Sequence, residues 1–139
     1  MRQATFILRT RTRGRGLHEI TSEVRGWIAG QAMTSGLLTL FCRHTSASLI
    51  IQENAAREVR DDLEAFFEQV APEAPGRYSH EDEGPDDMPA HIRTALTGVQ
   101  LSVPLIDGKL MLGTWQGIYV WEHRTHPHRR RVTVHILGE

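Results

Sequence analysis

Apolar and polar residues alternate along four segments in the last third of the chain, at positions 99–105, 109–112, 116–123 and 131–137. A period of two residues is typical of β-strands, and Asp107 with Gly108 between the first two segments predicts a hairpin turn. So many strands in succession constrain the fold to one that is built around a β-sheet.

The first half of the chain adds further strands and a helix. Residues 4–19 predict a hairpin that turns at the glycine-rich stretch 13–16, and an apolar spacing of three to four residues predicts a helix from Thr21. Residues 36–44 form an apolar run typical of a strand that is buried on both faces, and residues 48–52 predict the next strand.

A second helix is expected after Asn54, a good N-cap residue, because the apolar residues that follow it fall on one stripe. Residues 71–88 are rich in proline, glycine and acidic side chains and predict a long loop, and a short helix is expected at 89–96. With three helices and about eight strands, we expect a single α+β domain over residues 1–139, with a large mixed or antiparallel sheet.

The overall charge argues against two classes of partner. The chain has 16 Lys and Arg against 17 Asp and Glu, so neither nucleic acid nor a membrane is expected to bind it. Five arginines crowd the N-terminus, at positions 2, 9, 11, 13 and 15, and we interpret them as a solvated face. The single cysteine, Cys42, is expected in the core. No segment resembles a membrane span or a signal peptide, so we expect a cytoplasmic protein.

Histidines are the main candidates for chemistry, because the chain has 8 of them, although no two have the spacing of a local metal motif. His44 ends a strand, His80 lies in the acidic loop and His91 is at the start of the short helix, so three element ends could converge on one ion. Three others, placed where two strands must turn, are interpreted as an exposed loop: His123, His126 and His128.

The segment HTSASLIIQEN at positions 44–54 places three hydroxyl side chains after a histidine. A nucleophilic role for Ser46 or Ser48 is disfavoured, because neither is flanked by the glycines of a G-x-S-x-G turn. We interpret Thr45 and Ser46 instead as donors to an anion, although hydroxyls at strand ends more often satisfy the backbone. The glycine-bounded stretch 113–117 likewise allows a close approach of the backbone.

Four ordered segments carry a resemblance: HTSASLIIQENA at 44–55, YSHEDEGPDDMPAHI at 78–92, GTWQGIYVWEHR at 113–124 and RRRVTVHILGE at 129–139. In this order they resemble the YjbQ family, also labelled secondary thiamine-phosphate synthases. The resemblance implies a compact α+β subunit, assembled as a homotrimer, with histidines and carboxylates in a cleft that can hold a metal ion. It also implies a weak ability to join an aminopyrimidine diphosphate to a thiazole phosphate.

The histidines of the family fall on His44, His80 and His91, the three that stand out by position. Its polar positions are matched by six residues: Glu53, Asn54, Asp62, Thr114, Gln116 and Glu122. Two departures bear on substrate identity. His123 and Arg124 stand where the family commonly has an aromatic and an acidic residue, and GPDDMPAH replaces a loop with an asparagine near its middle.

The resemblance leads to a concrete hypothesis for a synthase. The three histidines would bind a divalent ion, zinc or magnesium, whose charge offsets that of the departing diphosphate. The thiazole nitrogen would capture the cation left on the pyrimidine methylene, so no protein nucleophile is needed. Catalytic roles in orienting water or moving a proton are expected for Glu122 and Asp62, supported by Asn54 and Glu53. Phosphate or substrate contacts are expected from five residues: Thr45, Ser46, Thr114, Gln116 and Arg129.

Alternatives stay open at the level of residues and of function. Glu122 can instead be a solvent-facing strand residue, and Asp62 a carboxylate on a helix surface. A metal-dependent phosphoester hydrolase would use the same ion to activate water, and a non-catalytic binding protein would use it only to brace a trimer. The expected partner is a small phosphorylated substrate. Oligomerisation also follows from the strands themselves, because they outnumber what three short helices can cover.

Overall fold

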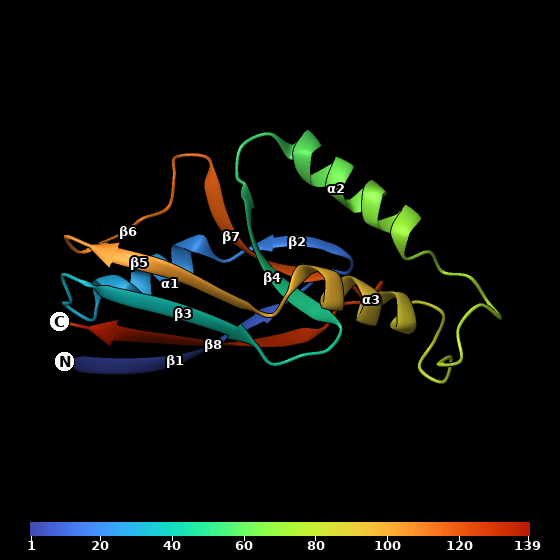
Figure 1. Cartoon of the computed structure of the whole chain (residues 1–139), viewed down its shortest axis with the longest axis horizontal. Helices are drawn as coiled ribbons and strands as arrows, with labels where there is room; N and C mark the ends of the chain where they lie inside the picture. Colours follow the sequence, from blue (N-terminus) through green and yellow to red (C-terminus); the bar gives the residue numbers. More distant parts are fainter.

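The computed structural model describes residues 1–139, with three helices and eight strands. The strands are β1 (Arg2–Arg11), β2 (Gly16–Glu19), β3 (Gly36–Cys42), β4 (Ala47–Glu53), β5 (Gln100–Ile106), β6 (Lys109–Leu110), β7 (Gln116–Glu122) and β8 (Arg129–Gly138). The helices are α1 (Thr21–Ala29), α2 (Arg57–Val70) and α3 (Asp87–Thr97). The predicted α+β class is confirmed, and Figure 1 shows α2 and α3 beside the strands, near the end opposite the termini.

The strands form two antiparallel sheets, of five strands in the order β1-β8-β3-β5-β6 and of three in the order β2-β7-β4. One hydrophobic core joins them. Leu38 and Leu40 of β3 pack with Val134 of β8, Ile118 of β7 contributes from the smaller sheet, and α1 adds Val24.

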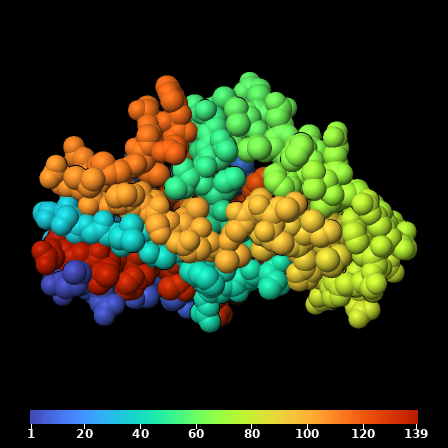
Figure 2. All heavy atoms as spheres, viewed as in Figure 1, coloured from blue at the N-terminus to red at the C-terminus, as the bar shows by residue number.

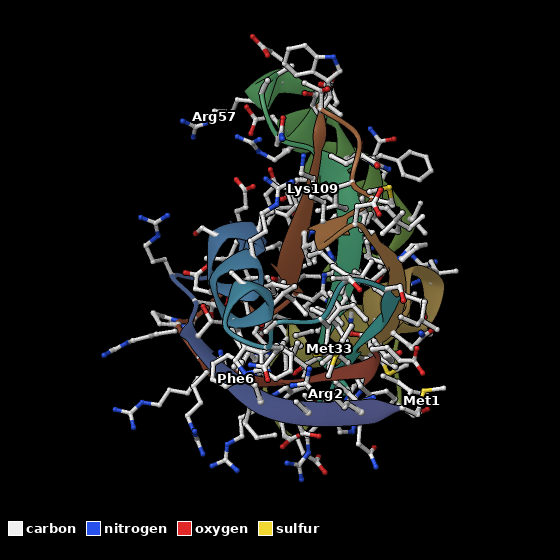
Figure 3. All side chains as sticks on the ribbon, turned by 90° about the vertical axis from the view of Figure 1, so that its left-hand side faces the viewer. Met1, Arg2, Phe6, Met33, Arg57 and Lys109 are labelled. Carbon is white, nitrogen blue, oxygen red and sulfur yellow. The ribbon has the colours of Figure 1, made fainter.

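The two ends of the chain are neighbours. β1 and β8 pair along their whole length, so Arg2 lies opposite Gly138. Phe6 of β1 stacks on Trp27 of α1 with ring centroids 5.7 Å apart, and Figure 3 shows Phe6 beside that helix. Arg2 Nη2 also donates to the carbonyl of Gln31, at 2.9 Å. The first strand therefore joins the C-terminal strand to α1.

The predicted hairpin over residues 4–19 is wrong, because β1 pairs with β8 and β2 with β7, in different sheets. Gly14 and Gly16, with φ of 121° and 139°, turn the chain from one sheet to the other. The hairpin at Asp107 and Gly108 is confirmed: it joins β5 to β6, and both residues have positive φ, of 50° and 74°.

The strand expected over residues 36–44 is β3, but it is not buried on both faces. Cys42 is buried with the inward residues of the strand, as expected, whereas Leu37 and Phe41 are each 47% exposed. Hydrophobic side chains therefore lie on the outer face of the larger sheet, where no helix of the same chain covers them.

The second helix is amphipathic as predicted, but α2 begins at Arg57 and none of its residues is buried. Asn54 does not cap it, because the Asn54 amide donates to the carbonyls of Thr114 and Gln116. Glu53 Oε2 instead accepts the backbone N–H groups of the two residues after Asn54. Figure 2 shows α2, in green, standing out from the body with a hollow between it and α3, in gold.

α3 begins at Asp87, two residues before the predicted start at Pro89. The segment 71–86 before it contains no helix or strand, in agreement with the predicted loop. None of the three helices combines the length and the apolar character that a membrane span requires.

Candidate functional site

The start of α3 and the loop before it bring four potential metal ligands together. Asp87 and His91 are four residues apart on α3 and so share a face of the helix, while His80 and Glu83 come from the loop. The distances to Asp87 Oδ2 are 2.6 Å from His80 Nε2 and 3.1 Å from His91 Nε2. One ligand atom from each of the four residues lies within 4.8 Å of the others, which is the proximity that a single ion requires.

Arg124 sets the electrostatics of this group. Its Nη1 donates to Asp87 Oδ1 at 2.7 Å, and its Nε donates to Asp86 Oδ2 at 2.9 Å. Burial acts to raise the pKa of Asp87, but the hydrogen bond with His80 and the charge of Arg124 hold that pKa below its ordinary value. The hydrogen bond to Asp87 in turn raises the pKa of His80. Asp87 is therefore an anion at neutral pH, with one oxygen turned toward the histidines.

The donor set fits zinc better than magnesium. Imidazole nitrogens combined with carboxylate oxygens are common zinc ligands, whereas magnesium prefers oxygen ligands and keeps several waters. The contact of Arg124 with the second oxygen of Asp87 is the type of outer partner that orients a ligating carboxylate. A metal ion would require both histidines in the neutral form, because only a deprotonated ring nitrogen can coordinate.

His44, the third histidine of the predicted site, is not a member of this group. Its Nε2 accepts the backbone N–H of Arg131 at 2.9 Å, and burial, followed by the charge of Arg130, lowers its pKa. A neutral imidazole that accepts at Nε2 carries its proton on Nδ1, so neither nitrogen has a lone pair free for an ion. In this arrangement His44 can donate a hydrogen bond through Nδ1.

Glu122, a predicted catalytic residue, is fully buried, so the alternative of a solvent-facing position is wrong. Its Oε1 accepts from Thr12 Oγ1 (2.6 Å) and Arg130 Nε (2.9 Å), and its Oε2 accepts from Arg124 N (3.2 Å) and Arg130 Nη2. Burial acts to raise its pKa, but the hydrogen bonds from Arg130 and Thr12 lower it. Four donors occupy the lone pairs of this carboxylate, so it stabilises the β7–β8 junction. Arg130 Nη2 also donates to Ser46 Oγ, at 3.0 Å.

Ser48 and His123 form a buried pair that resembles a nucleophile and its base. Ser48 Oγ lies 2.8 Å from His123 Nε2, but His123 Nδ1 accepts the Nε–H of Arg93 at 3.0 Å. A guanidinium cannot accept, so the proton of the neutral ring is on Nε2, which donates to Ser48 and cannot take its proton. This geometry agrees with the prediction that Ser48 is not a nucleophile. The predicted exposed loop is wrong for His123, which is fully buried, whereas His126 is exposed.

Three other predicted residues line one polar cavity of about 620 Å³: Asn54, Thr114 and Gln116. Glu19 and Arg25 add charges of opposite sign to its wall. Asn54 Nδ2 donates to the carbonyl of Thr114 at 3.1 Å, so the loop before β7 is held against the end of β4. This cavity and the group around Asp87 share no residue.

The remaining predicted residues stand apart from both places. Thr45, Asp62 and Arg129 are exposed. For Asp62 this position agrees with the alternative of a carboxylate on a helix surface. The sequence therefore predicted one site for all of these residues, whereas the single chain holds them at several separate places.

Glu83 and Asp87 are the members of the metal group that sequence reasoning missed. The spacing Asp87-x-x-x-His91 was a usable signal, because it puts both side chains on one face of a helix. A predicted helix start at Pro89 left Asp87 in the loop and hid that relation.

Comparison with known proteins gives a consistent result. A family model described as UPF0047 protein YjbQ-like matches residues 5–139. A UPF0047 protein of Synechocystis sp. is 51% identical over 138 residues, which are 99% of this chain and 94% of that protein. UPF0047 protein YjbQ of Escherichia coli O157:H7 is 41% identical, with 99% and 98% covered.

Solved structures agree with this comparison. A conserved hypothetical protein from Thermus thermophilus has a TM-score of 0.84 at 33% identity, with 95% of this chain and 99% of that chain covered. A protein of unknown function from Sulfolobus solfataricus has a TM-score of 0.87 at 23% identity, with 99% and 100% covered, and this likeness is one of fold alone.

Proposed function

The chain belongs to the YjbQ-like UPF0047 family, and on that premise we propose that it is a metal-binding cytoplasmic enzyme for a small phosphorylated substrate. The observation that supports this most is the approach of His80 and His91 to one oxygen of Asp87. The reaction that we propose is the weak coupling of an aminopyrimidine diphosphate to a thiazole phosphate, with loss of diphosphate.

The residues near the metal group have distinct roles in this proposal. His80, Asp87 and His91 hold the ion, Glu83 closes the group on its exposed side, and Arg124 keeps Asp87 anionic. The bound ion supplies positive charge that offsets the negative charge of the departing diphosphate. The coupling needs no protein nucleophile, which is consistent with a Ser48 hydroxyl that is committed to buried hydrogen bonds.

We also propose that the protein is a homotrimer. The support is the outer face of the larger sheet, where Leu37 and Leu137 are neighbours in the β3–β8 register and Phe41 lies on the same strand as Leu37. These three side chains are 42% to 47% exposed in the single chain. Burying such a face between subunits removes apolar surface from water, which is the main driving force of association.

Metal content tests the site. The chelator-treated protein is reloaded with zinc, and the bound metal is measured by elemental analysis after gel filtration. We expect about one ion per chain for the wild type, and strongly reduced binding for Asp87→Asn and His91→Ala, because the loss of one ligand of a small set removes most of the affinity. His126→Ala is the matched control, since this histidine is exposed and outside the group.

The variant His44→Ala tests whether His44 is a metal ligand or only a hydrogen-bond donor. If His44 donates only a hydrogen bond, the variant keeps its zinc; if it loses zinc, His44 is a ligand and must release the N–H of Arg131 to bind. Zinc retained in full by both Asp87→Asn and His91→Ala would contradict the proposed metal group.

Mass spectrometry of the products tests the reaction. Thiamine phosphate formed from the two substrates by the zinc-loaded wild type, and not by Asp87→Asn, supports the synthase. Turnover of simple phosphate esters without any coupling would instead support the hydrolase. Metal-dependent assembly without turnover of either substrate class would support the non-catalytic protein.

A further inference from the structure

The arginine-rich turn between β1 and β2 faces the first half of α2 across a cleft. The cleft has a volume of about 440 Å³, and its walls carry four arginines, at positions 13, 15, 57 and 60, against two carboxylates, Asp61 and Glu64. A second cavity of about 360 Å³ shares Arg13 and Arg60 with it and adds Arg11 and one carboxylate, Glu19. The solvated face expected for the N-terminal arginines therefore includes a concave, positively charged surface.

The turn is held in place by His18. Its Nε2 accepts the backbone N–H of Arg13 at 3.0 Å, and its Nδ1 lies 3.1 Å from the carbonyl of Gly16, to which it donates. Gly14 has a φ of 121°, and a Cβ there would lie 2.9 Å from the carbonyl oxygen of Thr125. The backbone at Gly14 thus packs closely against the loop after β7. This contact and the hydrogen bonds of His18 together fix the turn that carries Arg13.

The guanidinium of Arg60 is fixed on the opposite wall. Its Nη1 donates to the carbonyl of Glu53 (3.1 Å) and to the hydroxyl of Tyr119 (3.2 Å), and it lies 5.7 Å from the centre of the Tyr119 ring. These contacts use one of its nitrogens. A guanidinium that is already ordered loses less conformational freedom when a ligand binds.

Two of the other arginines that line the cleft, Arg13 and Arg57, have no close carboxylate partner within the chain. The Arg13 side chain has no hydrogen-bond or ion-pair partner in the chain, although its backbone N–H is engaged by His18. Arg57 meets only Asp61, at 3.8 Å between two exposed side chains, and Figure 3 shows it extending away from the helix. Arg15, by contrast, pairs with Glu64 and Glu73. The unbalanced charge is thus on Arg13, Arg57 and Arg60.

We propose that this cleft binds the phosphate group of a small phosphorylated molecule through Arg13, Arg57 and Arg60. Guanidinium groups bind phosphate through paired hydrogen bonds, and the cavity volume is in the range of small-molecule sites. The site shares no residue with the metal group, so it does not depend on the proposed reaction.

The rest of the surface favours a small anion over a nucleic acid. The chain has a net charge of −1, and α2 adds carboxylates to the cleft and beside it: Asp61 lines the wall, and Glu68 lies 4.0 Å from Arg15. Carboxylates on this side of α2 disfavour a long polyanion more than a single phosphate group, which covers less of the surface.

Calorimetric titration of chelator-treated protein with inorganic pyrophosphate tests the site at fixed ionic strength. We expect saturable binding by the wild type that is weakened roughly tenfold or more in Arg13→Gln, because a charged hydrogen bond contributes about that factor. Arg13 is the sharpest probe, since its side chain has no structural contact to lose. Arg9→Gln is the matched control, because Arg9 is an exposed arginine of β1 outside the cleft.

His91→Ala distinguishes this cleft from the metal group and should bind pyrophosphate as the wild type does. Unchanged binding by Arg13→Gln, or loss of binding in His91→Ala, would overturn the proposal. Tighter binding of a single-stranded oligonucleotide than of pyrophosphate, lost in Arg13→Gln, would also overturn it and identify a surface for polyanions.

Discussion

His123 shows at the level of one residue how a buried polar network fixes a protonation state. The ring is bound on both sides, by Arg93 and by Ser48, and the Thr97 hydroxyl lies 2.7 Å from Ser48 Oγ. Burial, followed by the nearby charge of Arg93, lowers the pKa of His123 from 6.5 to about 2. The ring is therefore neutral in the folded protein throughout the pH range in which the protein is handled.

The first prediction concerns the pH dependence of stability. Below about pH 6.5 the unfolded chain takes up a proton at His123 that the folded chain excludes, so the free energy of unfolding falls as the pH falls. The slope from this residue is at most about 1.4 kcal/mol per pH unit. We expect His123→Gln to be less stable than the wild type at neutral pH, and this difference to shrink as the pH is lowered.

Urea unfolding at several pH values between about 7 and 5 measures this change. His18 and His44 also have pKa values that are lowered, mainly by burial, and they are present in both proteins, so their contribution cancels in the comparison. A stability difference that stays constant over this range would contradict a neutral, buried His123.

At the level of elements, Glu64 is the main polar link between α2 and the rest of the molecule. Its Oε1 pairs with Arg93 of α3, and its Oε2 accepts the indole N–H of Trp121 at 2.8 Å. Phe67 adds an edge-to-face contact with Trp121, with ring centroids 5.0 Å apart. Because no residue of α2 is buried, these contacts and the hydrogen bonds of Arg60 to Glu53 and Tyr119 decide where the helix docks.

The second prediction is that Glu64→Gln destabilises the protein by about 3–5 kcal/mol, because it leaves the fully buried Arg93 without its counter-ion. Urea unfolding measures the effect. Glu58→Gln removes a carboxylate from the exposed side of the same helix and should change stability by less than about 0.5 kcal/mol. Equal effects of the two substitutions would show that the Glu64–Arg93 pair contributes little.

The third prediction concerns the ends of β3 and β8, where two glycines face each other. A Cβ added at Gly138 would lie 2.1 Å from the carbonyl oxygen of Ser35 and 2.8 Å from the Cα of Gly36. Gly138→Ala must therefore push the two strands apart, and we expect a loss of roughly 1–3 kcal/mol in urea unfolding.

Gly26→Ala is the matched control for this change. Gly26 lies in α1, it is exposed, and a Cβ there would meet nothing within 4 Å. Because alanine favours the helix over glycine, this variant should gain up to about 1 kcal/mol. A Gly138→Ala protein as stable as the wild type would show that the strand ends tolerate a wider spacing.

At the level of the whole molecule, the outer face of the larger sheet predicts association. We expect light scattering at micromolar concentration to give three times the mass of one chain, because Leu37, Phe41 and Leu137 are each almost half exposed in the monomer. Leu37→Glu should dissociate the assembly, whereas Val59→Glu, which places the same charge on an exposed apolar position of α2, should not. A monomeric wild type would refute the trimer.

Much of the fold could be predicted from the sequence, because periodicity is a property of neighbouring residues. The positions of the strands, the amphipathic stripe of α2, the buried Cys42 and the turn at Asp107 all depend on local spacing and turn chemistry. Element boundaries were less accurate, and the start of α3 at Asp87 mattered most, since it decides which side chains share a face with His91.

Only the tertiary structure decided how distant segments meet. β1 pairs with β8 and not with β2, because burial of the inner face selects the register across the whole length of the chain. The same packing groups His80 with Asp87 and His91, while a backbone N–H holds His44 elsewhere. Periodicity shows which face of an element is apolar, but which polar atoms come within hydrogen-bonding distance depends on long-range contacts, and so does the charge that each of them carries.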